Sequence, residues 1–144
     1  MIRVVLDTNI VVSALLQPLG PPAQVFVLAT SGSIQMCMSG AVYAEYEEVI
    51  SRPRFRRSQD IIDGALLAVR EKGFWVRPTE TIRACSDRDD NIFLECAHAA
   101  QATYLVTGNL KHFPTSWEGA RIVTARWLLD IISDAAQEPA RTET

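Results

Sequence analysis

The first residue of this chain that could do chemistry is Asp7, which directly follows the run Ile2-Arg3-Val4-Val5-Leu6. That run is almost entirely apolar, so it predicts a strand buried on both faces, as in the middle of a parallel sheet. Ligands of open α/β sheets bind at the carboxyl ends of such strands, where Asp7 would lie. The alternative is that Asp7 or Thr8 only caps the helix that follows.

A second acidic centre runs from Asp87 to Asp90. Behind it the apolar residues recur at helical spacing, which predicts a helix over about 90–102. Acids are favoured at a helix start, and Ser86 or Asp87 can serve there as the cap. Asp90 lies three residues before Phe93, in line with the inward stripe of the helix. Capping alone does not explain an acid at that position.

A third acid, Glu45, lies on the helix predicted over about 39–51. The inward stripe of that helix consists of Val42, Tyr46, Val49 and Ile50, and successive residues turn by about 100°. Glu45 therefore lies at the border of the stripe, while Glu47 and Glu48 turn toward solvent. Glu45 is the acid of this helix that could face a cleft.

Positive charge is concentrated directly after this helix, at Arg52, Arg54, Arg56 and Arg57. These residues form either a solvated surface or a phosphate-binding patch beside an active site. The net charge of −3 argues against general nucleic-acid binding, but it allows a local basic groove.

Strands alternate with helices along the chain, which predicts a three-layer α/β/α fold with a five-stranded parallel sheet. The expected strands cover 2–6, 34–38, 73–76, 104–106 and 121–123. The expected helices cover 10–16, 23–30, 39–51, 61–70, 90–102 and 124–135. Right-handed crossovers would bring the strand ends after Leu6 and Val106 to one edge of the sheet, with Asp7 and Asn109.

The chain has 144 residues and is expected to form one domain over 1–136, with a flexible polar tail over 137–144. No secretory signal or membrane-spanning stretch is recognisable, so a cytoplasmic protein with no membrane partner is expected. Its three cysteines form no CxxC pair, which disfavours a structural zinc site and a disulfide framework.

Several carboxylates in one cleft repel one another and raise at least one pKa unless a cation is present. Oxygen ligands completed by water suit Mg²⁺ or Mn²⁺. Such an ion can orient and help deprotonate a water and stabilise charge on a phosphodiester. The acids therefore favour a metal-dependent nuclease.

The runs that carry these residues are 5–9 (VLDTN), 39–45, 87–91 (DRDDN) and 106–113 (VTGNLKHF). In this order and spacing they resemble a PIN domain, in particular the branch of toxins from toxin–antitoxin pairs, over residues 2 to about 129. The resemblance implies a five-stranded parallel sheet, a Mg²⁺ or Mn²⁺ site and cleavage of single-stranded RNA. It also implies a homodimer and an inhibitory antitoxin.

By position, the resemblance makes Asp7, Glu45 and Asp90 the catalytic, metal-binding acids. The fourth acidic position is Asn109, whose amide oxygen can reach a metal but carries no charge, and Asp87 is the residue that could compensate. The expected supporting residues orient the carboxylates by hydrogen bonds; they are Thr8, Asn9 and Thr107. The residues expected to steer the RNA are Arg52, Arg54 and Lys111.

Two other functions compete with the nuclease. A phosphotransferase with Asp7 as nucleophile would resemble haloacid-dehalogenase-like enzymes, which carry an aspartate where this chain has Asn9. A PIN-fold binding module could have lost activity together with its fourth acid. Nucleotide-dependent enzymes are disfavoured because neither GxGxxG nor GxxxxGK[ST] occurs.

Overall fold

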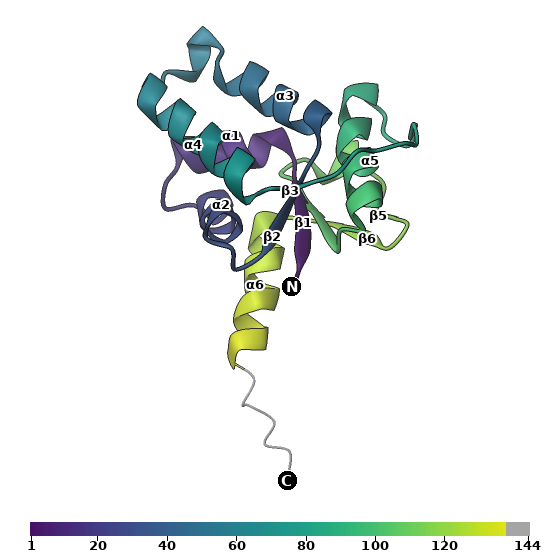
Figure 1. Cartoon of the computed structure of the whole chain (residues 1–144). Coiled ribbons are helices and arrows are strands. Elements are labelled where there is room, and N and C mark those ends of the chain that lie inside the picture. Colours follow the sequence, from purple (N-terminus) through teal and green to yellow (C-terminus); the bar gives the residue numbers. More distant parts are fainter. Residues whose placement is uncertain (138–144) are drawn as a thin grey trace.

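The computed structural model describes residues 1–137, which fold around one twisted sheet (Figure 1). The strand order is β3-β2-β1-β4-β6-β5. The strands β3, β2, β1, β4 and β6 run parallel, and β5 pairs antiparallel with β6. The bounds are β1 Arg3–Leu6, β2 Gln35–Met38, β3 Phe74–Trp75, β4 Tyr104–Val106, β5 Ser116–Trp117 and β6 Ala120–Val123.

The prediction of a five-stranded, purely parallel sheet is therefore wrong, although the α/β class is right. The strand that the sequence did not indicate is β5, which is only two residues long. It turns into β6 through Glu118 and Gly119, which both have positive φ. Such a turn is the geometry of a tight hairpin, but Asn-Gly or Asp-Gly is its usual signal. The Glu118-Gly119 pair lacks this signal, so the sequence did not predict the hairpin.

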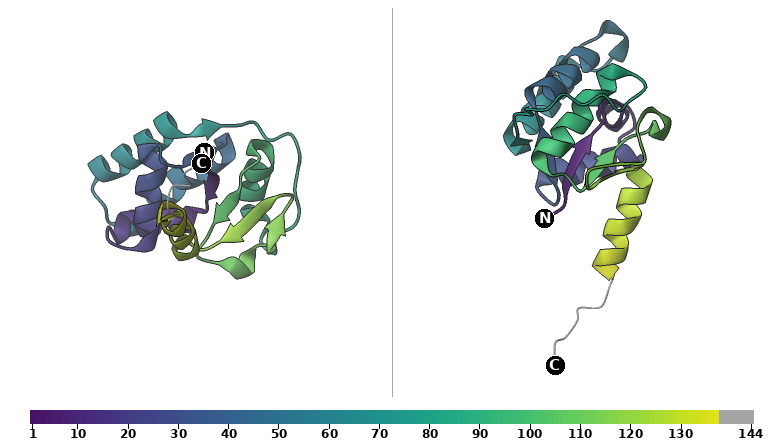
Figure 2. Two further views of the ribbon diagram at one scale, coloured as in Figure 1. Left: turned by 90° about the horizontal axis from the view of Figure 1, so that it is seen from below. Right: turned by 90° about the vertical axis from the view of Figure 1, so that its right-hand side faces the viewer.

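Helices cover both faces of the sheet, with α1 to α4 on one side of β1 and β2 in Figure 1 and α5 on the other. The last helix, α6, packs against α2 and projects from the body (Figure 2). The α-helices are α1 Thr8–Leu16, α2 Pro21–Ser31, α3 Gly40–Ile50, α4 Gln59–Lys72, α5 Asn91–Ala100 and α6 Ala125–Gln137. Short 3₁₀ turns are η1 Pro53–Phe55, η2 Arg88–Asp90 and η3 Leu110–His112.

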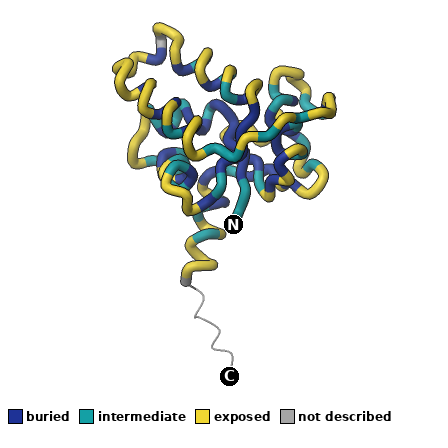
Figure 3. Tube along the Cα trace, in the orientation of Figure 1, coloured by how far each residue is buried: buried dark blue, intermediate teal, exposed yellow. Residues whose placement is uncertain are grey.

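The core lies along the central strands (Figure 3). Val4, Val5 and Leu6 of β1 are fully buried, as expected for a strand covered on both faces. Tyr46 of α3 is also fully buried, and its hydroxyl donates a hydrogen bond to the carbonyl of Leu6. This bond fixes α3 to the carboxyl end of β1, next to Asp7.

The predicted tail lies outside the described residues, except for Gln137, which ends α6. Within residues 1–137 no single helix is long and apolar enough to cross a membrane. The helices α1 and α2 reach that length and composition only as a pair, and they are bent by 105° at their junction.

Candidate active site

Two neighbouring strands deliver polar residues to the same edge of the sheet. Leu6 of β1 lies opposite Val106 of β4, and the Asp7 amide donates to the Val106 carbonyl at 2.9 Å. The predicted meeting of these strand ends is confirmed. Asp7 and Thr107 therefore leave the sheet side by side.

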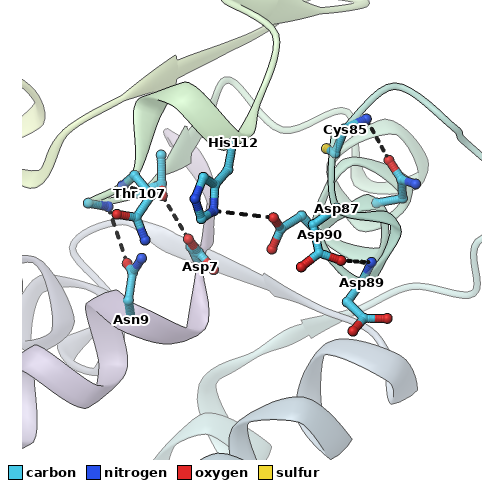
Figure 4. Close-up of polar contacts among 11 residues, drawn as sticks. Asp7, Asn9, Cys85, Asp87, Asp89, Asp90, Thr107 and His112 are labelled. Atoms are coloured by element: carbon cyan, nitrogen blue, oxygen red, sulfur yellow. Dashed lines mark hydrogen bonds and ion pairs between the residues drawn. The ribbon is translucent and has the colours of Figure 1, made fainter.

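Asp7 occupies the N-cap position of α1, but its side chain makes no capping hydrogen bond. Instead its Oδ2 accepts a hydrogen bond of 2.7 Å from the Thr107 hydroxyl (Figure 4). The Thr107 oxygen in turn accepts the amide of Asn109 at 3.0 Å, which fixes the direction of the hydroxyl. The Asp7 side chain is thus held by the residue that follows β4 and does not cap α1.

Asp7 is buried, with 6% of the residue exposed. Burial raises its pKa above the ordinary value, and the hydrogen bond from Thr107 opposes that rise. The nearby imidazole of His112 also lowers the pKa of Asp7, by a smaller amount. A buried carboxylate without a cationic partner in contact is unfavourable, so the fold maintains this charge at a cost.

Asp90 approaches the same place from the start of α5. Its side chain does not cap the helix; Asp87 caps the preceding turn η2 by accepting the Asp89 amide at 2.9 Å. The Asp90 side chain is 18% exposed, and its Oδ2 lies 3.4 Å from Nδ1 of His112. That contact lacks hydrogen-bond geometry, which leaves the buried Oδ2 without a hydrogen-bond partner.

Burial raises the pKa of Asp90 to about 6, and the charges of Asp7 and Asp87 add to the effect. His112 acts in the opposite direction. Because the charge of Asp7 raises the pKa of Asp90 and His112 acts on both, the two carboxyls share one electrostatic environment.

Glu45 enters from α3, whose first turn is capped by Ser39 accepting the Val42 amide at 3.2 Å. Burial is the largest cause that raises the pKa of Glu45, followed by the charge of Glu48. Arg52 lowers it, and Asp7 makes a smaller raising contribution. Glu45 is therefore electrostatically coupled to the buried aspartate.

These side chains surround a cavity of about 280 Å³, which we call the acidic cavity. Its lining comprises Asp7, Thr8, Asn9, Val12, Glu45, Val49, Asp87, Asp90, Asn109 and His112. Asn9 additionally ties α1 to the loop after β4, because its Oδ1 accepts the Gly108 amide at 3.2 Å. Thr107 is fully buried and supports Asp7 without lining the cavity.

Two of the residues predicted to steer RNA do not line this cavity. Lys111 and Arg52 are absent from its lining. Arg52 makes a two-point contact with Glu48, with nitrogen–oxygen distances of 3.1 and 2.7 Å. The side chain of Arg54 lies outside the described part of the structure.

Sequence reasoning missed His112 and Asn91. His112 belongs to the 106–113 run, and its place shortly after the end of β4 was the available signal. Asn91 is 6% exposed, and its Oδ1 accepts the amides of Ala84 and Cys85 at 3.1 and 2.9 Å. It fixes the loop that leads into Asp87, a role only a folded structure reveals.

The donor set of the acidic cavity fits Mg²⁺ or Mn²⁺. Within residues 1–137 no three His, Cys, Asp or Glu side chains form a cluster that could hold an ion directly. Mg²⁺ does not need such a cage, because it keeps several waters and uses one or two carboxylates. Asp7 and Asp90 can supply these, and both Asp90 Oδ2 and the buried hydroxyl of Thr8 lack hydrogen-bond partners.

A larger hollow, of about 590 Å³, lies around His98. Thr103 and Gly119 line it, just before β4 and β6 begin, so it lies at the amino ends of these parallel strands. His98 contacts Glu80 through Nε2 at 3.2 Å and Glu118 through Nδ1 at 3.0 Å. Both of these glutamates contact the histidine, whereas Asp7 has no cation in contact among the described residues, so we place the chemistry at the acidic cavity.

The chain belongs to the PIN domain family, whose model matches residues 3–111. PIN domains are generally nucleases, which is the class that the family assigns to this chain.

Two known proteins illustrate the relationship. An uncharacterized protein of Methanocaldococcus jannaschii, MJ1680, is 29% identical over 111 residues, which cover 75% of this chain and 71% of the relative. The crystal structure of VapBC2 from Rickettsia felis, bound to a DNA fragment from their promoter, contains a chain that matches with a TM-score of 0.54. That match covers 84% of this chain and 97% of the other at 16% identity, and it is a likeness of fold.

Proposed function

We propose that the protein is an endoribonuclease that cleaves single-stranded RNA with the help of Mg²⁺ or Mn²⁺ in the acidic cavity. The observation that carries the proposal is that two mostly buried carboxylates, Asp7 and Asp90, line one cavity. No cationic side chain contacts Asp7 among the described residues, and the Oδ2 of Asp90 has no hydrogen-bond partner. Structural acids are normally paired or solvated. Asp7 has no described cation in contact, and Asp90 only approaches the half-exposed His112. A cationic ligand best explains this arrangement.

The residues divide the work as follows. Asp7 and Asp90 would hold the ion, and Thr107 keeps the Asp7 carboxylate in place through its hydroxyl. When bound, the ion supplies a counter-charge for the phosphodiester and a more acidic water. Glu45 lines the cavity and can accept a proton from water there. Asn109 offers an amide oxygen, and His112 can donate a hydrogen bond to a phosphate oxygen.

Cleavage of a labelled single-stranded RNA pool tests the proposal. With Mn²⁺ we expect the wild-type protein to cleave, and a chelator should stop it. The variant Asp7→Asn should be inactive, whereas the matched variant Glu80→Gln, which removes a carboxylate from the other hollow, should remain active. Chelator-insensitive cleavage would contradict the metal mechanism.

We further propose that the protein is the toxin of a toxin–antitoxin pair, acts in the cytoplasm as a homodimer and is inhibited by a cognate antitoxin. The family supports this, and so does the fold likeness to a chain of the VapBC2 complex. Induced expression should arrest bacterial growth, and Asp7→Asn should not. Co-expression with a small neighbouring gene should relieve the arrest; an Asp7→Asn variant that is equally toxic would refute the proposal.

A second candidate function is a catalytically inactive PIN-fold binding module. Asn109 at the fourth acidic position favours it, because one negative charge of the family pattern is missing. Thermal unfolding with millimolar Mn²⁺ discriminates the two. An inactive module should gain no stability from the ion, whereas the nuclease should gain stability that depends on Asp7 and Asp90.

A further inference from the structure

A second hollow opens beside the acidic cavity and shares part of its wall. It has a volume of about 520 Å³, and Val12 and Val49 line both spaces. We call it the arginine hollow, after the basic residues at its rim, Arg52, Arg56 and Arg57. An extended polymer with one phosphate at the acids would pass directly into this space.

The walls of the arginine hollow are apolar. Besides the shared valines it is lined by Leu16, which is 42% exposed, and by Phe55, which is 8% exposed. Ligand sites commonly combine such apolar walls with a few charged groups that fix orientation. A nucleobase presents an apolar face to walls of this kind, while its phosphate requires a cation.

The three arginines differ in how much positive charge they leave free. Arg52 is neutralised by Glu48. Arg57 donates to the carbonyls of Leu15 and Leu16 at 3.0 and 3.1 Å. Those partners are neutral groups at the end of α1, so the guanidinium keeps its charge while it caps the helix.

Arg56 is exposed and has no hydrogen bond or ion pair with any described residue. Its φ is 55°, in the left-handed region that a residue with a side chain seldom adopts. Such strain often accompanies functional positions. The exposed rim therefore carries two uncompensated positive charges, at Arg56 and Arg57.

We propose that the arginine hollow binds the nucleotide next to the phosphodiester that is cleaved. The base would pack against Val12 and Leu16, and the neighbouring phosphate would lie at Arg56 and Arg57. This inference rests on the proposed ribonuclease function. RNA is favoured over a protein occupant because a polyanion that must approach buried carboxylates needs adjacent positive charge.

Binding of a short fluorescein-labelled single-stranded RNA of random sequence tests the proposal, with Asp7→Asn as the background to prevent cleavage. Arg56→Asn should weaken binding about fivefold and lower the slope of log affinity against log salt by about 0.7. Asparagine suits the left-handed backbone there, so the fold is preserved. Leu16→Glu should weaken binding about tenfold, because it places a negative charge on the base-binding wall.

Two matched controls use residues remote from the hollow. Lys72→Asn removes one positive charge at the end of α4, near the amino end of β3. Leu67→Glu changes a leucine that is 45% exposed, close to the exposure of Leu16. Both controls should bind RNA within about twofold of the background protein. Thermal unfolding of all four variants shows whether each is folded.

The outcomes separate this inference from the proposed function. If the wild type cleaves RNA but Arg56→Asn and Leu16→Glu leave KM and affinity unchanged, the nucleotide site is overturned and the nuclease survives. Such a result would assign the hollow to a protein occupant or to solvent. If both variants weaken RNA binding but the wild type does not cleave, the site stands and the nuclease fails. An Asp7→Asn protein that binds no RNA would overturn the site.

Discussion

Two hollows of this molecule each place one histidine near two carboxylates, at opposite edges of the sheet. Around His98, the side chains of Glu80 and Glu118 are 65% and 57% exposed, and each contacts one nitrogen of the ring. In the acidic cavity, the two acids that interact with His112, Asp7 and Asp90, are largely buried, while 52% of the His112 side chain is accessible.

This difference in burial of the acids indicates that the hollow around His98 contributes to stability and that the acidic cavity serves function. Exposed glutamates that meet a histidine carry little energetic cost and gain a modest ion pair. Buried aspartates that repel each other weaken the fold unless a cation joins them. Perturbed carboxyls in a cleft are a recognised mark of functional sites. The two hollows should therefore respond in opposite ways to removal of an acid.

The largest expected contrast is in RNA cleavage. Asp7→Asn should lower kcat/KM by at least about 100-fold, because it removes a charge next to the reacting phosphate. Glu80→Gln in the other hollow should change kcat/KM by less than about twofold. Quantitative cleavage of one labelled RNA by both variants measures the contrast. Equal losses of kcat/KM in both variants would contradict the assignment of the active site to the acidic cavity.

The next largest contrast is in metal-dependent stability. At Mn²⁺ concentrations tenfold above Kd, the wild type should gain about 1.4 kcal/mol, which is a rise in Tm of a few degrees. Asp90→Asn should lose this gain and Glu118→Gln should keep it. Calorimetry of the three proteins with and without Mn²⁺ provides the measurement. A gain that persists in Asp90→Asn would remove this residue from the metal site.

Without metal, Asp90→Asn should stabilise the protein near neutral pH. The pKa of Asp90 is raised from 3.8 to about 6 in the folded protein, so the folded state binds this proton more tightly than the unfolded state. The resulting stability is present below about pH 4 and is lost as the pH rises through about 6. Asn cannot ionise, so the variant should lack this decline.

Thermal unfolding of chelator-treated wild type and Asp90→Asn between pH 4 and pH 8 measures the effect. We expect the two Tm curves to separate as the pH rises, by about 2–4 °C per kcal/mol of lost stability. Parallel curves would mean that folding does not raise the pKa of Asp90.

The smallest effect is expected at the other hollow. Glu118→Gln should destabilise the protein by about 0.2–1 kcal/mol, because it removes one exposed contact between a carboxylate and His98. Urea unfolding of the wild type and of Glu118→Gln at the same pH provides the measurement. Stabilisation by Glu118→Gln would mean that this hollow also holds repelling charges.

The part of the site that depends on local pattern was predictable from the sequence. The apolar run of β1 indicated a buried strand, and its end indicated the edge where Asp7 lies. Whether Asp7 caps α1 could not be decided locally, because its partner Thr107 lies 100 residues away. The sequence left Ser86 and Asp87 as alternative caps and set Asp90 apart from them, and the fold shows that Asp87 makes the capping bond while Asp90 makes none.

Other features were not predicted from the sequence because the patterns that indicate them are short or weak. The strand β5 has two residues and an unusual turn, so neither periodicity nor turn chemistry marked it. The pairing of Arg52 with Glu48 follows helical i, i+4 spacing and was readable in principle. The shared wall of the arginine hollow joins α1 to α3, which no sequence pattern indicates.

Crystallographic anomalous scattering from a Mn²⁺-soaked crystal tests the metal assignment most directly. We expect one Mn²⁺ in the acidic cavity, bound by the carboxylates of Asp7 and Asp90 and otherwise by water. A cavity without Mn²⁺ at saturating concentration, or an ion bound instead among Glu80, His98 and Glu118, would contradict the assignment.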